Sequence, residues 1–310
     1  MGQSEGIDVT EQQQGNSKPG RLTLLCVHPH PDDESISCGG VLARYADAGR
    51  RTVVVTCTGG EEVDNLAGID LGDEPLTSHR VRELEDALEV LGVEQHHWLG
   101  YRDSGMVGEA SNGHPDSFHV ADLEEAAHRL ARIVRLEQPQ VMVSDDAQGG
   151  YGHPDHIKAN RVTIRALELA ADPDAAIEGE PWLIAKRYVH TFGRGRLRIA
   201  HEAFLSAGVP SPFEQDDPVA GEDPPFGIED ALVTTEVDVM PWLERKRAAM
   251  AAHRSQIGGD SFFLNAPEDV VGILFGLEQF VLEHGPDPEL RPETDLFAGL
   301  RPDPGGKDGR

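Results

Sequence analysis

Two short motifs that combine histidine with carboxylate residues are the features of this sequence best suited to chemistry. They are His30–Glu34 (HPDDE) and His153–His156 (HPDH). Each motif follows an apolar run typical of a buried strand, at Leu22–Val27 and at Val141–Ser144. In open parallel sheets, the loops at the carboxyl ends of the strands form the site. The two motifs therefore predict one site built from two loops.

The residue types in these motifs are those that bind a catalytic metal ion. We expect His30 and Asp33 to supply two ligands from the first loop, and His156 to supply a third from the second. Two imidazoles and one carboxylate suit zinc, and Fe²⁺ or another divalent ion is compatible with the same set. Three protein ligands leave one coordination position open, as in catalytic zinc sites. The pattern indicates a metal-dependent hydrolase.

The other motif residues predict proton transfer beside the metal. Asp32 neighbours a predicted ligand but would point in another direction, so it is the candidate general base. His153 lies three residues before His156, so one of them would bind metal while the other faces the substrate. His153 would then stabilise an oxyanion or protonate the departing amine, and the Tyr151 phenol could donate to the same oxygen. Either motif alone could be only a polar turn or a helix cap. The two together favour a site.

Strand and helix patterns alternate from residue 21 to about residue 172. Strands are predicted at 21–27, 52–56, 97–101 and 140–144, and helices at 40–48, 78–91, 121–137 and 155–170. This alternation predicts an α/β fold, with a Rossmann-like, mainly parallel sheet and helices on both faces. No GxGxxG motif follows the first strand, so a dinucleotide is not expected.

One domain is expected over residues 21–300, with its core at 21–172 and a less regular, substrate-side part at 173–300. In this later part we predict strands at 186–192 and 230–239, helices at 242–256 and 267–284, and a surface loop or lid at 209–227. Residues 1–20 are expected to form a flexible segment and 301–310 a tail.

Composition restricts the partners. The formal net charge of −28 argues against a nucleic acid or an anionic membrane surface. No apolar stretch approaches the ~20 residues that span a bilayer. Of the three cysteines, Cys26 and Cys57 lie in strand-like runs and are interpreted as buried thiols, and with Cys38 they form no CxxC pair. A cytoplasmic location fits the lack of a disulfide framework. A homo-oligomer is left open.

With these motifs the chain resembles the LmbE-like or PIG-L superfamily of zinc-dependent de-N-acetylases, over most of residues 21–300. The first motif is similar to the superfamily's HPDDE motif and the second to its HPDH motif. The resemblance implies an LmbE-like fold. It also implies these roles: metal ligands His30, Asp33 and His156, general base Asp32, acid or electrostatic partner His153, and carbonyl-polarising Tyr151.

Within the superfamily, the chain is similar to two enzymes of the mycothiol pathway, the N-acetylglucosaminyl-inositol deacetylase and the mycothiol S-conjugate amidase. This similarity implies substrate contacts by Ser37, Arg80 and Asp103. Ser37 matches the deacetylase, whereas 212–215 and 260–263 look more like the amidase. The expected substrate is a small amino sugar conjugate of the N-acetylglucosamine (GlcNAc) type, from which an N-acetyl group is hydrolysed. The alternatives are the conjugate amidase, a deacetylase of a secondary-metabolite intermediate, and a non-enzymatic metal- or sugar-binding module.

Overall fold

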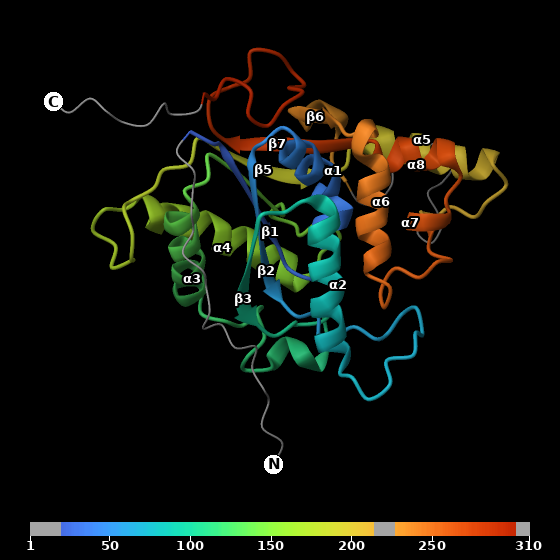
Figure 1. The fold of residues 1–310 in the computed structure, drawn as a ribbon, viewed down its shortest axis with the longest axis horizontal. Helices are drawn as coiled ribbons and strands as arrows, with labels where there is room; N and C mark the ends of the chain where they lie inside the picture. Colours follow the sequence, from blue (N-terminus) through green and yellow to red (C-terminus); the bar gives the residue numbers. More distant parts are fainter. Residues whose placement is uncertain (1–19, 214–226, 302–310) are drawn as a thin grey trace.

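A seven-stranded sheet between two layers of helices forms the protein (Figure 1). The computed structural model describes residues 20–213 and 227–301. The strands follow the order β3-β2-β1-β4-β5-β7-β6. Neighbouring strands from β3 to β5 are parallel, while β7 is antiparallel to both β5 and β6. The predicted α/β class with a mainly parallel sheet is confirmed. The strands are β1 (Thr23–His28), β2 (Arg51–Thr58), β3 (Gln95–Tyr101), β4 (Val141–Ser144), β5 (Lys186–Thr191), β6 (Thr235–Asp238) and β7 (Leu277–His284).

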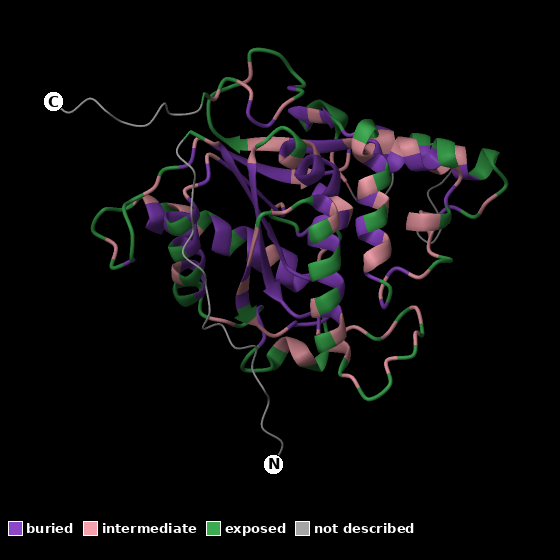
Figure 2. Ribbon diagram, in the orientation of Figure 1, coloured by how far each residue is buried: buried purple, intermediate pink, exposed green. Residues whose placement is uncertain are grey.

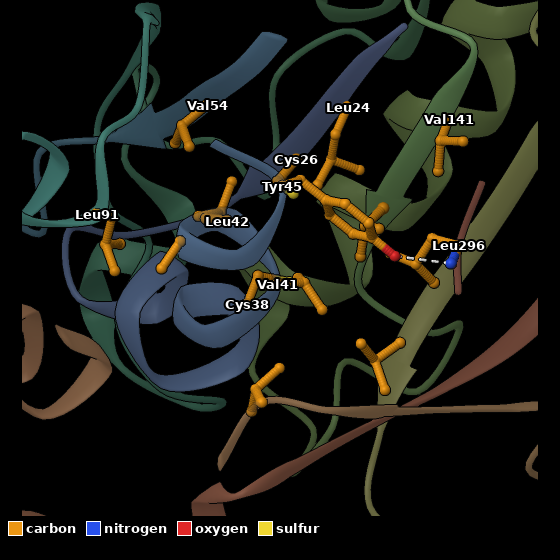
Figure 3. Close-up of a cluster of buried hydrophobic side chains, with 14 of the residues drawn as sticks. Leu24, Cys26, Cys38, Val41, Leu42, Tyr45, Val54, Leu91, Val141 and Leu296 are labelled. Carbon is orange, nitrogen blue, oxygen red and sulfur yellow. Dashed lines mark hydrogen bonds between the residues drawn. The ribbon is translucent and has the colours of Figure 1, made fainter. Parts of the chain in front are cut away.

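Helices cover both faces of this sheet. Side chains of a strand point alternately to the two faces, so Leu24 and Cys26 of β1 pack in one buried cluster and Leu25 and Val27 in another. The strands are buried along most of their length (Figure 2), and Figure 3 shows part of the first cluster. No helix in the described ranges is long and apolar enough to cross a membrane. The α-helices are α1 (Asp33–Asp47), α2 (Leu76–Leu91), α3 (Leu123–Glu137), α4 (Pro154–Ala171), α5 (Arg194–Ser206), α6 (Leu243–Ala252), α7 (Phe262–Asn265) and α8 (Glu268–Phe275).

The helix predicted at 267–284 is wrong in its second half. Helix α8 ends at Phe275, and the following residues form β7. The apolar residues of this stretch are compatible with either structure, because a short apolar run does not distinguish a buried helix from a buried strand. Pairing with β5 and β6 decides for the strand, and Phe280 is fully buried there.

Helix α1 begins at Asp33, well before the start predicted at residue 40. Asp33 and Glu34 lie in its first turn, where their negative charges stabilise the positive end of the helix dipole. Gly39 and Gly40 lie inside the helix, and a Cβ at Gly40 would come within 2.5 Å of Val239. The first motif therefore lies on the turn between β1 and α1.

Three further expectations differ from the structure. The strand predicted at 230–239 is shorter, because Asp230–Leu232 form a 3-10 helix before β6. Helix α6 ends at Ala252, before the predicted residue 256, and helix α5 was not predicted. Of the loop or lid predicted at 209–227, residues 214–226 lie outside the described residues.

Candidate active site

The two motifs meet at the carboxyl ends of β1 and β4. His30 lies between β1 and α1, while His153 and His156 lie at the start of α4, after β4. The ring centroid of His30 is 4.7 Å from that of His153 and 5.3 Å from that of His156. Three histidines from two loops therefore converge on one point.

Three side chains are placed to hold a divalent metal ion. Oδ2 of Asp33 lies 3.4 Å from Nδ1 of His30 and 3.5 Å from Nε2 of His156. Ligands about 2.0–2.2 Å from a tetrahedral ion lie about 3.3–3.6 Å from one another, so these spacings match. Nε2 of His156 is buried and has no hydrogen-bond partner among the described residues. The donor set and the unpaired nitrogen both fit a metal ion.

The opposite edge of the His30 ring faces two carboxylates. Nε2 of His30 lies 3.3 Å from Oδ2 of Asp155 and 3.4 Å from Oδ1 of Asp103. Both carboxylates are fully buried, and their contacts with Nε2 fix the orientation of the ring. This leaves Nδ1 as the nitrogen of His30 directed at Asp33.

His153 is held differently from His156. As the residue that caps α4, it accepts a hydrogen bond at Nδ1 from the backbone N–H of Asp155, at 3.1 Å. Its donor atoms lie within 4.8 Å of those of His30 and His156, so it remains beside the metal position. Burial, with His30 and His156 nearby, lowers the pKa of His153 to about 4. His153 is therefore a neutral imidazole at neutral pH.

Asp145, which the sequence did not indicate, orients His156, the third predicted ligand. Oδ1 of Asp145 lies 2.7 Å from Nδ1 of His156 and 3.0 Å from Nε2 of His190. Burial would raise the pKa of Asp145, but the two histidines hold it well below its usual range. Asp145 follows directly after β4, and this position at a strand end was the only signal in the sequence.

Asp32, the candidate base, has an unusual backbone conformation. Its φ is 113°, in a region that favours glycine, and such strain costs on the order of 1–3 kcal/mol. The Asp32 carboxylate lines a cavity. Burial raises its pKa to about 6, with Asp33 acting in the same direction and Arg80 opposing it. Strain and a raised pKa at one carboxylate are typical of a functional residue.

Arg80 lies behind the first motif. Its Nη2 donates to the carbonyl of Pro31 at 2.6 Å, and its Nη1 donates to the carbonyl of Gly60 at 2.8 Å. Nη2 also lies 3.5 Å from Oδ2 of Asp32. Arg80 is almost completely buried, and neither it nor Asp103 is among the cavity-lining residues. Ser37, the third predicted substrate contact, does line the cavity.

The buried pair Glu34 and His253 stabilises the turn between β1 and α1. Nε2 of His253 lies 2.8 Å from Oε1 of Glu34, and the backbone N–H of Asp32 donates to Oε2 of Glu34 at 3.0 Å. Burial would raise the pKa of Glu34, but its contacts with His253 lower it to about 2. Glu34 belongs to the first motif, yet nothing in the sequence indicated His253 as its partner.

A cavity of about 440 Å³ opens beside Asp32, Asp33 and His156. Tyr151 is on its wall, 63% exposed, with its ring centroid 5.4 Å from that of His156. The remaining wall is largely apolar and includes Ile36, Phe192, Leu197, Phe213, Phe262, Phe263, Leu274 and Phe275.

The sequence and the fold were compared with those of known proteins. A family model described as PIG-L: GlcNAc-PI de-N-acetylase matches residues 25–167. A protein of Thermobifida fusca, named 1D-myo-inositol 2-acetamido-2-deoxy-alpha-D-glucopyranoside deacetylase, is 44% identical over 89% of this chain and 98% of its own length. A protein of the same name from Streptomyces avermitilis is 43% identical over 90% of this chain and 97% of its own length.

Among solved structures with this fold is the N,N'-diacetylchitobiose deacetylase of Pyrococcus horikoshii, with a TM-score of 0.57 and 21% sequence identity. The alignment covers 90% of this chain and 86% of that one. The likeness extends from the sheet core into the later part of the chain.

Proposed function

The chain belongs to the PIG-L family of de-N-acetylases, and on this basis we propose that it is a zinc-dependent hydrolase that removes the N-acetyl group from a GlcNAc conjugate. One observation carries the metal chemistry. Asp33 lies within ligand spacing of both His30 and His156, next to Asp32, whose backbone is strained. The named deacetylases at 43–44% identity support the substrate class.

His30, Asp33 and His156 would hold the ion. Their two imidazoles and one carboxylate suit zinc, and loading with Fe²⁺ tests the other divalent candidate. When bound, zinc supplies a Lewis acid for the amide carbonyl and lowers the pKa of water to about 7. Carboxylate oxygens keep the two rings in place. Asp145 contacts His156, and Asp103 and Asp155 contact His30.

Asp32 accepts the proton of the attacking water. Asp32 lines the cavity next to Asp33, so its carboxylate would face a water molecule held beside the predicted ligands. Hydrogen bonds from Arg80 to the Pro31 carbonyl and from the Asp32 N–H to Glu34 hold the strained turn. Once protonated, Asp32 can return the proton to the departing amine.

His153 donates a hydrogen bond to the developing oxyanion. Because its Nδ1 accepts the N–H of Asp155, the neutral ring carries its hydrogen on Nε2. This leaves Nε2–H free to donate to a substrate oxygen. Tyr151, whose phenol is protonated at neutral pH, provides a second donor on the wall of the cavity.

The apolar wall favours a second candidate substrate. Five phenylalanines, Phe192, Phe213, Phe262, Phe263 and Phe275, line the cavity beside the predicted metal ligands. An inositol ring presents hydroxyl groups that would find few partners on such a wall. A thiol conjugate of an amino sugar with an apolar substituent, the substrate class of the S-conjugate amidase, would bury that substituent there.

A substrate panel tests both candidates. The zinc-loaded protein should release acetate from a GlcNAc–inositol conjugate, and an Asp32→Asn variant with equal zinc content should not. If amide cleavage of an apolar thiol conjugate is faster than deacetylation, the second candidate is the better one. Absence of cleavage of every substrate at full zinc occupancy would contradict the proposed function.

A further inference from the structure

A second group of metal-binding side chains lies inside the protein. The donor atoms of Cys26, His28 and Cys38 all lie within 4.8 Å of one another, and the three residues are fully buried. Cys26 and His28 are two residues apart on β1, so they point to the same face of the sheet. Helix α1 packs on that face and carries Cys38 (Figure 3). The strand–turn–helix unit thus forms this group as well as the first motif.

The imidazole ring of His28 is buried without hydrogen bonds to the described residues. Its exposed fraction is 0%, and neither ring nitrogen has a hydrogen-bond partner among the described residues. A buried polar group without a partner costs about 1–3 kcal/mol, and such groups are rare in folded proteins. A bound ion would supply the missing partner for one nitrogen.

We propose that Cys26, His28 and Cys38 form a second metal site, which binds a thiophilic divalent ion of the zinc class. Sulfur and imidazole donors select zinc over hard ions such as Mg²⁺ or Ca²⁺. Two thiolates, one neutral imidazole and a divalent ion sum to zero net charge. A neutral assembly is far less costly to bury in an apolar cluster than a charged one.

All three cysteines are free thiols, so Cys26 and Cys38 are available as metal ligands and not paired in a disulfide.

The second site would fasten β1 to α1, on either side of the turn that carries His30, Asp32 and Asp33. Metal ligation across a strand and a helix adds binding free energy to folding. Its three donors are buried and do not line the cavity, so the second site is separate from the first. It does not depend on the proposed function.

Cobalt substitution tests this site independently of activity. Metal-free protein is titrated with Co²⁺, whose bonds to thiolate sulfur give an intense near-ultraviolet charge-transfer band. The first site contains no sulfur, so it cannot produce this band. We expect the wild type to bind two equivalents with the band, and Asp33→Ala to bind one equivalent and keep the band. Zn²⁺ should raise the unfolding temperature of Asp33→Ala.

Cysteine variants identify the ligands. Cys26→Ser and Cys38→Ser should lose the band and retain one equivalent, while Cys57→Ser, a buried thiol on β2 outside the group, should keep both. Circular dichroism checks that each variant is folded. If a variant is not, the wild-type and Asp33→Ala spectra still decide. A single equivalent without the band in the wild type would overturn the proposal, as would loss of the band in Asp33→Ala or in Cys57→Ser.

Discussion

Oδ1 of Asp145 lies 2.7 Å from Nδ1 of His156, and this contact turns Nε2 of the same ring toward Asp33. Carboxylates in this position fix the orientation of a ligating histidine and increase its basicity. The end of β4 therefore acts on the candidate metal site through Asp145, which is not one of the predicted ligands.

Replacing this carboxylate should weaken metal binding without abolishing it. We expect Asp145→Asn to lower zinc affinity by roughly 10–100-fold, because the amide orients the ring less well. Competition with a chelator measures the change. Asp174→Asn, at an exposed position, is the matched control. Wild-type affinity in Asp145→Asn would show that the contact does not support the site.

Metal binding and turnover should separate between neighbouring residues. Asp32→Asn should keep its zinc and lower kcat by roughly 10²–10⁴-fold, the usual contribution of a general base. His156→Ala should lose the zinc. Metal analysis and steady-state kinetics on the same preparations give both quantities. Equal loss of zinc in the two variants would instead make Asp32 a ligand.

Arg80→Ala should affect the turn that holds the base more than substrate affinity. The guanidinium is buried and donates to the carbonyls of Pro31 and Gly60, so its loss leaves buried acceptors unpaired. Each such bond contributes about 1.5–3 kcal/mol. We expect a lower free energy of unfolding and a lower kcat, with KM little changed.

The control for Arg80 is on the same helix. The Arg82 side chain is 55% exposed, so Arg82→Ala should have little effect on kcat or KM. A rise in KM alone for Arg80→Ala, at normal stability, would support the direct substrate contact that the family resemblance implies.

Loss of His253 should destabilise the protein strongly. His253→Ala would leave the Glu34 carboxylate buried without its partner, and breaking such a pair costs about 3–5 kcal/mol. Denaturant unfolding measures the loss. His119→Ala, at an exposed histidine, should be close to neutral. If Glu34→Gln combined with His253→Gln is as unstable as His253→Ala, the unpaired charge is not the cause.

Protonation of His96 should contribute to acid destabilisation. Burial, assisted by His97, lowers its pKa from 6.5 to about 4. The unfolded chain therefore binds a proton at a higher pH than the folded one, so this contribution to stability is present above about pH 6.5 and is lost as the pH falls toward 4. His96→Gln should reduce this slope. Unfolding measured from pH 7 to pH 4.5, with a chelator present, checks it. Identical slopes would contradict the assignment.

The α/β class and the two motifs were accessible from the sequence, because both are local patterns. Strands and helices alternate with their own periodicities, and HPDDE and HPDH each stand directly after a strand-like run. The carboxyl ends of parallel strands lie at one edge of a sheet, so the meeting of the two motifs follows from the pattern.

The tertiary structure alone decided what depends on partners distant in the chain. The stretch Leu277–His284 is a strand because β5 and β6 offer it hydrogen bonds. His253 contacts Glu34, which is 219 positions away in the sequence. Arg80 is buried against the loops that carry Pro31 and Gly60, whose carbonyls accept its hydrogen bonds. Sequence periodicity records which face of an element is apolar, but not which distant atom lies against it. The His30 ring, for example, lies against Asp103 and Asp155, which are 73 and 125 positions away in the sequence.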